Sequence, residues 1–286
     1  MLTRIITAIV LIAAVLAWLF LADYAIFTIG ALFIYMVGAY EMGPLLGYKK
    51  RYIFVLLAVI ASTLLFAFAN PGLYIEQDIP PLVKYVIASG LLVWITSIPL
   101  LIKYPQDTAW HKNLFINSIL GILMLLPFLA SLLVLRAHQF QENSNIGAYL
   151  VLSVMALVWC ADSGAYFTGR LMGKTPMLPR VSPKKTMEGL AGGLVTALIA
   201  LVIFVHYNLF GDLGNNLIAL LIAGPIAIVF SVVGDLVESM LKRLVGIKDS
   251  GRIFPGHGGM LDRIDSQLAA LPLFLTVIMA LNGDLF

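Results

Sequence analysis

Apolar residues run through this chain in long blocks that short polar segments separate. A helix needs about 20 mostly apolar residues to cross the hydrocarbon core of a membrane. The blocks therefore predict nine membrane-spanning helices, at about residues 5–22, 25–46, 53–69, 84–102, 114–135, 147–168, 190–206, 216–234 and 267–282. The first block is longer than the apolar core of a signal peptide and ends in bulky residues, so we expect it to be retained as a span.

Two connections, 169–189 and 235–266, are long and rich in glycine, proline and charge. Loops that carry Lys and Arg tend to stay on the cytoplasmic side of a membrane. If the N-terminus is inside, all of the 18 basic residues except Lys84 and Arg136 fall on that side. We therefore predict a cytoplasmic N-terminus, an external C-terminus and two long loops that face the cytoplasm.

The composition supports a membrane protein. The chain is 61% hydrophobic and 12% charged, whereas a soluble domain carries roughly 25% charged residues. A net charge of +3 is too small to indicate nucleic-acid binding. The predicted fold class is thus an all-α polytopic membrane protein.

The two parts of the chain differ in where their ionisable residues lie. Before residue 140 these residues lie mostly in loops, whereas Asp162, Asp235 and Glu238 stand within or at the ends of spans. A charge in hydrocarbon costs at least about 2.5–3.5 kcal/mol unless it is paired, binds a metal or lines a wet cavity. We expect 1–140 to form a scaffold that could carry dimer contacts, and 141–286 to hold the chemistry.

A polar stripe lies at the end of the eighth predicted span. Asp235, Glu238, Ser239 and Lys242 are spaced so that they share one face of a helix. The stripe predicts either a solvated helix end with an internal Asp–Lys pair or the wall of an active cavity.

A glycine-rich segment leads into the last span. Gly251, Gly256, Gly258 and Gly259 permit close backbone approach, and a helix N-terminus suits phosphate. Asp262 and Asp265 in the first turn could be helix caps or ligands of Mg²⁺, which binds one or two carboxylates together with waters and phosphates.

Basic residues accompany these acidic groups. Lys248 and Arg263 could offset phosphate charge. Lys184 and Lys185 precede another span, where they could bind a substrate phosphate or simply anchor the loop on the cytoplasmic side. Asp162 is followed by glycines on its helix face, which indicates a cavity wall or a close helix contact.

Together these segments resemble the phosphatidate cytidylyltransferase (CDP-diacylglycerol synthase) family. The family signature reads here as Ser239, Lys242-Arg243, Lys248-Asp249, His257-Gly258-Gly259, Asp262-Arg263 and Asp265. The resemblance implies Mg²⁺-dependent transfer of CMP from CTP to phosphatidic acid, with release of pyrophosphate, by a homodimer. The compact chain favours the bacterial inner membrane, and the basic loops place the active site on its cytoplasmic side. The resemblance also places the metal-binding aspartates on Asp235 and Asp262 and leaves a second cation open.

The expected site follows from the motifs and the resemblance together. The catalytic set is Asp235, Asp262, Lys242, Arg243, Lys248, Asp249, His257, Arg263 and Asp265. The substrate-binding set is Asp162, Lys184, Lys185, Ser239, Gly258 and Gly259. The role of His257 is left open between phosphate binding and proton transfer.

Two other functions are compatible with parts of the pattern. A CTP-dependent kinase of polyprenol or another lipid alcohol would transfer the γ-phosphate and release CDP. A secondary transporter would also carry charged residues inside spans, but usually near the middle of the membrane and in paired repeats. The charges here crowd the cytoplasmic span ends and no repeat is visible, which favours an enzyme.

Overall fold

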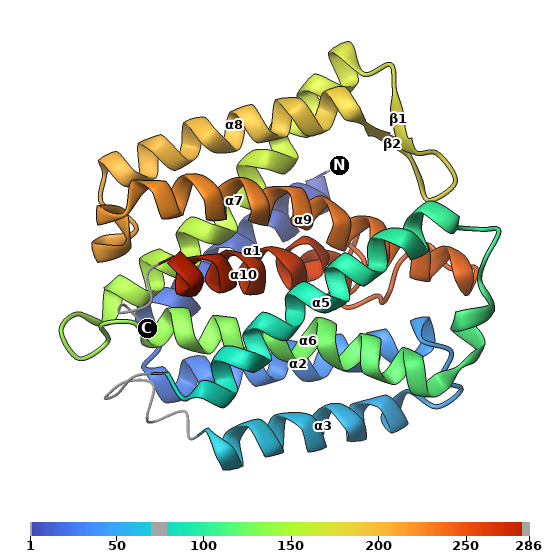
Figure 1. Cartoon of the computed structure of the whole chain (residues 1–286), viewed down its shortest axis with the longest axis horizontal. Helices are drawn as coiled ribbons and strands as arrows, with labels where there is room; N and C mark the ends of the chain where they lie inside the picture. Colours follow the sequence, from blue (N-terminus) through green and yellow to red (C-terminus); the bar gives the residue numbers. More distant parts are fainter. Residues whose placement is uncertain (1, 70–78, 282–286) are drawn as a thin grey trace.

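The computed structural model describes residues 2–69 and 79–281, with side chains from Ile6 onward. Within these ranges the chain forms nine α-helices, two short 3₁₀ helices and one hairpin (Figure 1). The α-helices are α1 (Leu2–Leu21), α2 (Tyr24–Leu45), α3 (Arg51–Phe68), α5 (Pro81–Lys103), α6 (Leu114–Ala137), α7 (Ser144–Met172), α8 (Met187–His206), α9 (Leu217–Leu244) and α10 (Leu261–Leu281). The 3₁₀ helices are η1 (Ala109–Lys112) and η2 (Gly211–Asn215), and strands β1 (Pro176–Leu178) and β2 (Ser182–Thr186) pair antiparallel.

The helices have the length and surface of membrane spans. Eight of those in the described part of the chain, α2 to α10, are long and apolar enough to cross a bilayer, while the apolar stretch of α1 that could be assessed, Ile6–Leu21, is shorter. Large apolar side chains point outward, for example Ile29, Phe33 and Leu56, each more than half exposed. Such a surface suits hydrocarbon rather than water, and the prediction of a helical polytopic membrane protein is confirmed.

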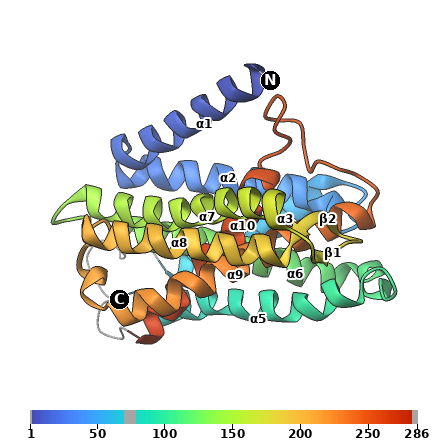
Figure 2. The ribbon, with the colours of Figure 1, turned by 90° about the horizontal axis from the view of Figure 1, so that it is seen from above.

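The long polar connections gather at one end of the bundle. The α2–α3 loop, the α5–α6 connection, the hairpin and the α9–α10 loop all lie toward the right of Figure 1 and Figure 2. Successive spans place every second connection on the same side of a membrane, so the predicted spans require these connections to lie at one end. The predicted sides of the termini remain predictions, and Met1 and residues 282–286 lie outside the described residues.

The last helix, α10, occupies the middle of the bundle. It contacts α2, α5, α6, α7 and α9, and an unbroken run from Gln267 to Leu275 is buried. Its N-terminus therefore meets helices from both parts of the sequence, which is why residues far apart in the chain can meet there.

Side-chain caps fix several helix ends. The end of α9 and the start of α10 differ most from the predicted span ends. Asn216 accepts the N–H of Ala219 at the start of α9, and Thr186 accepts the N–H of Gly189 at the start of α8. α9 continues to Leu244 and α10 begins at Leu261, so half of the predicted loop 235–266 is helical. The apolar pattern missed these turns because they carry the polar side chains described below.

Glycines allow α7 and α8 to pack closely. A Cβ atom on Gly193 would lie 2.8 Å from the backbone oxygen of Ala161, which cannot move without distorting α7. Small residues at such contacts are typical of membrane helix packing.

We expect Gly193→Leu to destabilise this helix pair by about 1–3 kcal/mol, the usual cost of overpacking a filled interface. Thermal unfolding of the purified protein in detergent should show a lower midpoint. Gly214→Ala is the control, because a Cβ there meets only Asn208 Oδ1 at 3.8 Å. Equal midpoints for the two variants would contradict the assignment of Gly193 to a tight contact.

Candidate active site

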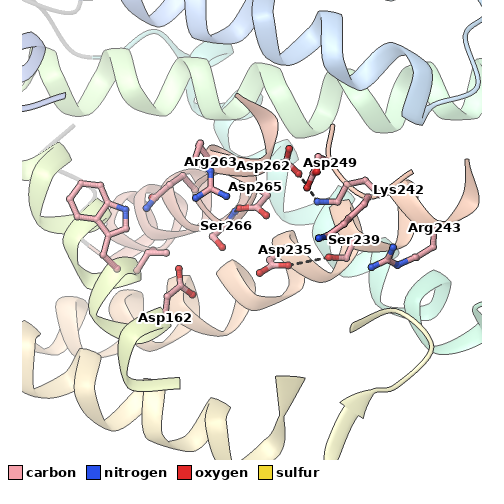
Figure 3. A pocket seen from close by; sticks show the side chains of 14 residues that line it. Asp162, Asp235, Ser239, Lys242, Arg243, Asp249, Asp262, Arg263, Asp265 and Ser266 are labelled. Atoms are coloured by element: carbon pink, nitrogen blue, oxygen red, sulfur yellow. Dashed lines mark hydrogen bonds and ion pairs between the residues drawn. The ribbon is translucent and has the colours of Figure 1, made fainter. Parts of the chain in front are cut away.

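A polar cavity of about 440 Å³ lies between α7, α9 and α10 (Figure 3). Its lining combines carboxylates with lysine and arginine side chains. The residues are Val158, Trp159, Asp162, Asp235, Ser239, Lys242, Arg243, Lys248, Asp249, Asp262, Arg263, Asp265, Ser266 and Gln267. The structure thus brings Asp235 and Asp262, predicted from two different spans, to the walls of one cavity.

Close packing of α9 and α10 creates this meeting. A Cβ on Gly234 would lie 2.5 Å from the backbone oxygen of Asp265, so the two helix backbones almost touch there. Asp235, the next residue, and Asp265 then face the same space, together with Asp162 from α7 (Figure 3). The glycine is therefore needed for the acidic cluster to form.

The Asp262 carboxylate accepts four hydrogen bonds. Its Oδ2 accepts the N–H of Ser250 at 2.9 Å, the hydroxyl of Ser250 at 2.9 Å and the N–H of Gly259 at 2.8 Å. Its Oδ1 accepts Lys242 Nζ at 2.7 Å. The carboxylate thus binds N–H groups of the segment before α10 and none of the helix itself, so the cap proposed for this residue is not formed, and it also lines the cavity.

Lys242 joins two acidic groups. Its ammonium forms ion pairs with Glu238, one turn earlier on α9, and with Asp262 on α10. The side chains of all three residues are at most 12% exposed. The internal pair of the polar stripe is consequently Glu238–Lys242.

Asp235 forms an ion pair with the hairpin. Its Oδ2 lies 2.6 Å from Lys185 Nζ on strand β2, and its Oδ1 accepts the hydroxyl of Ser239 at 3.3 Å. The hairpin that carries Lys185 is held by Glu188, whose carboxylate accepts the N–H groups of Lys174 and Thr175. Lys185, predicted only as a phosphate ligand or an anchor, therefore contacts a predicted metal ligand.

A second cavity, of about 520 Å³, is formed by the glycine-rich segment. Its charged lining residues are Lys248, Asp249, Arg252 and Arg263, and it also includes His257, Gly251, Gly256 and Gly258. Lys248, Asp249 and Arg263 line the first cavity as well, so the two adjoin.

Five predicted residues do not line the first cavity. Gly258 shares the second cavity with His257, Lys184 and Lys185 line a third cavity described below, and Gly259 lines none of the three. His257 lines only the second cavity among those described. Gly259 is buried and acts through its N–H, which donates to Asp262. Arg252, absent from the predicted set, belongs to the second cavity.

A third cavity, of about 350 Å³, has a mixed character. Lys184, Lys185 and Ser182 supply polar groups, whereas Met177, Leu190 and Val232 supply apolar ones. Asp162 and Asp235 line both this cavity and the first. The Lys184–Lys185 pair thus stands beside the acidic cluster.

One buried acid near the site was not predicted. Glu41 on α2 is 2% exposed, and its Oε2 accepts the hydroxyl of Ser250 at 3.1 Å and the N–H of Leu261 at 2.8 Å. The signal was present, since Glu41 lies inside a predicted span where a charge is costly. The predicted site did not include Glu41, because the chemistry was expected in residues 141–286.

The acidic residues suit a divalent cation. Five aspartates line the first cavity against four lysine and arginine side chains, so a polyphosphate there would face strong repulsion without an added cation. Within the described residues no group of three or more His, Cys, Asp or Glu side chains has the arrangement of a metal site. Mg²⁺ needs only one or two carboxylates when phosphates and waters complete its shell, so the assignment to Asp235 and Asp262 stays a prediction.

The pattern of the cytidylyltransferase family matches residues 2–281. The chain belongs to the cytidylyltransferase family. Its relatives include phosphatidate cytidylyltransferases of Haemophilus influenzae, 37% identical over 95% of this chain and 96% of that protein, and of Pseudomonas aeruginosa, 38% identical over 97% and 96%.

A third relative comes from another bacterium. The phosphatidate cytidylyltransferase of Bacillus subtilis is 37% identical over 97% of both chains. The resemblance drawn from the motifs is therefore confirmed. As a cytidylyltransferase, the chain is a nucleotidyltransferase with several membrane-spanning helices.

Proposed function

We propose that this protein is a phosphatidate cytidylyltransferase, which joins CTP to phosphatidic acid and releases pyrophosphate. The observation that carries the proposal is that residues of the family signature line one cavity. They are Asp235, Asp262, Lys242, Lys248 and Arg263. The full-length similarity to proteins of that name supports the same activity.

The first two cavities suit the nucleotide. Lys248 and Arg263 lie where the cavities adjoin, and Arg252 extends the cationic lining beside His257. We assign the triphosphate of CTP to this surface. Mg²⁺ held by Asp235 and Asp262 would neutralise phosphate charge, and Asp162, Asp249 and Asp265 would orient these groups or support a second cation.

The third cavity suits the lipid substrate. Phosphatidic acid has an anionic phosphate and apolar chains, and this cavity combines Lys184 and Lys185 with apolar side chains. Asp162 and Asp235 line both the first and the third cavity, so a phosphate bound by Lys184 and Lys185 would lie next to the nucleotide.

The reaction needs positioning more than proton transfer. A phosphate oxygen of phosphatidic acid forms a bond to the α-phosphorus of CTP, and the bond from that phosphorus to the bridging oxygen of the β-phosphate breaks. The attacking oxygen is already anionic near neutral pH, so no strong base is required. Lys242, Arg243, Lys248 and Arg263 would stabilise the charge that moves to pyrophosphate, as cationic groups do in phosphoryl transfer.

The proposed activity fits a site on the cytoplasmic face of a bacterial inner membrane, where CTP is available. The positive charge of the loops at the site end supports this orientation. A homodimer, which the family resemblance implies, is proposed for this chain as well.

Radiolabelled CTP tests the reaction directly. Purified protein with phosphatidic acid, CTP and Mg²⁺ should move label from [α-³²P]CTP into lipid, and label from [γ-³²P]CTP into free pyrophosphate. This pattern follows because the α–β bond is the one that breaks. Label from [γ-³²P]CTP in the lipid, with a lipid alcohol as acceptor, would instead identify a lipid kinase and overturn the proposal.

A further inference from the structure

The Glu41 carboxylate lies within the turn formed by residues 250–261, which leads to Asp262 at the cavity. The side chain comes from α2, more than 200 residues away in the chain, and bonds to Ser250 and Leu261 at the two ends of the turn. A Cβ atom on Gly251 or Gly259 would collide with its oxygens. The backbone of the turn is therefore wrapped closely around this one carboxylate.

Ser250 connects Glu41 with Asp262. Its hydroxyl lies 3.1 Å from Glu41 Oε2 and 2.9 Å from Asp262 Oδ2, and its N–H donates to the same Asp262 oxygen. A hydroxyl has one proton to donate, so the two carboxylates share it. Leu261, bonded to Glu41 through its N–H, immediately precedes Asp262.

We propose that Glu41 is a positioning residue for Asp262, which it orients through Ser250 and the N-terminus of α10. Glu41 does not line any of the three cavities, so it contacts neither proposed substrate. Its carboxylate fixes both ends of the segment 250–261, and this fixes the direction in which Asp262 faces Lys242 and the cavity. The inference rests on the proposed function for its kinetic consequences.

A purely structural role for Glu41 would have different consequences. Loss of a side chain with a purely structural role lowers the stability of the whole fold. Loss of a positioning residue also changes the function of the side chain that it orients. Partners in the second shell of a metal site typically contribute roughly 10–100-fold in metal affinity or activity. Substitution of Glu41 should therefore change the Mg²⁺ concentration that the reaction needs more than it changes KM for the substrates.

The test compares Glu41→Gln and Glu41→Ala with Tyr35→Phe. Tyr35 lies on the same helix, is buried and donates to the backbone oxygen of Ala58 at 3.0 Å, so its variant loses a buried hydrogen bond away from the turn. The Mg²⁺ concentration for half-maximal activity should rise about 10-fold in Glu41→Gln and about 100-fold in Glu41→Ala. It should not change in Tyr35→Phe, and KM for CTP should change less than the Mg²⁺ requirement.

Hydrogen exchange gives a second readout that does not depend on activity. The amide of Leu261 should exchange faster in Glu41→Gln than in wild type or Tyr35→Phe, because glutamine keeps the size of the side chain but offers this N–H a neutral oxygen, which accepts a weaker hydrogen bond than a carboxylate does. If Glu41→Ala does not fold, Glu41→Gln and Ser250→Ala supply the same comparison.

The possible results are distinguishable. Unchanged Mg²⁺ dependence and unchanged exchange in an active Glu41→Gln enzyme would overturn the positioning role. Absence of CMP transfer by the wild-type protein would overturn the proposed function, while faster exchange at Leu261 would still support the contact through which Glu41 positions the turn.

Discussion

Asp235→Asn and Asp262→Asn should each lower the rate of CDP-diacylglycerol formation by at least about 10²–10³-fold, the usual loss when a charge-stabilising group is removed from an active site. Both aspartates line the cavity where the nucleotide phosphates are proposed to bind. An asparagine has one acceptor oxygen and no charge, so it binds a divalent cation poorly. The measurement is the initial rate with purified protein at saturating CTP, phosphatidic acid and Mg²⁺.

The two variants should differ in stability, because their surroundings differ. Asp262 accepts hydrogen bonds at both oxygens from donors alone, so an asparagine NH₂ group there would face another donor. Asp235 is 29% exposed and can accommodate an amide. We therefore expect a lower unfolding temperature for Asp262→Asn and a nearly unchanged one for Asp235→Asn.

Asp107→Asn is the matched control for this pair. Asp107 is exposed in the connection after α5 and lines none of the three cavities. Its variant should keep wild-type activity and stability. If Asp235→Asn and Asp262→Asn also kept near wild-type turnover, the assignment of the metal to these residues would be wrong.

Lys242→Met should damage both folding and activity. The substitution leaves Glu238 and Asp262 without the cation that they share. Removing one partner from a buried ion pair typically costs about 3–5 kcal/mol, because the remaining charge is buried alone. Thermal unfolding in detergent should show a clear fall in midpoint, and CMP transfer should fall because the triphosphate loses a cationic neighbour.

A second substitution separates these two effects. Glu238→Gln combined with Lys242→Met removes one of the two unpaired carboxylates, so it should recover part of the stability but little of the activity. Interactions of this kind appear as non-additivity in a double-mutant cycle. Strictly additive losses of stability would show that Glu238 and Lys242 do not act as a pair.

Hydropathy predicted the number and order of the helices but not the ends that form the site. The apolar blocks correspond in order to α1 through α10. The last turns of α9 and the first of α10 were assigned to a loop because Asp235, Lys242 and Asp262 interrupt the apolar pattern. The short strands β1 and β2, which bring Lys185 to Asp235, carry no pattern long enough to predict.

The motifs predicted which residues would meet, but not how they pair. The signature placed Lys242 and Asp262 near a common centre, and both line one cavity. The pairing of Lys185 with Asp235 depends on the path of the hairpin, and the contact of Glu41 with Ser250 joins residues 209 positions apart. Neither leaves a local signal in the sequence except that Glu41 is an acid in an apolar span.

The packing of α2 against the N-terminus of α10 limits how far this enzyme could be shortened. All recognisable motifs lie after residue 155, so a half-length version beginning near residue 141 would keep every signature residue. It would nevertheless lose the side chain around which residues 250–261 fold, and the amide of Leu261 would have no acceptor in its place. We therefore expect the motif-bearing half alone to be inactive, because the first helices complete its interior.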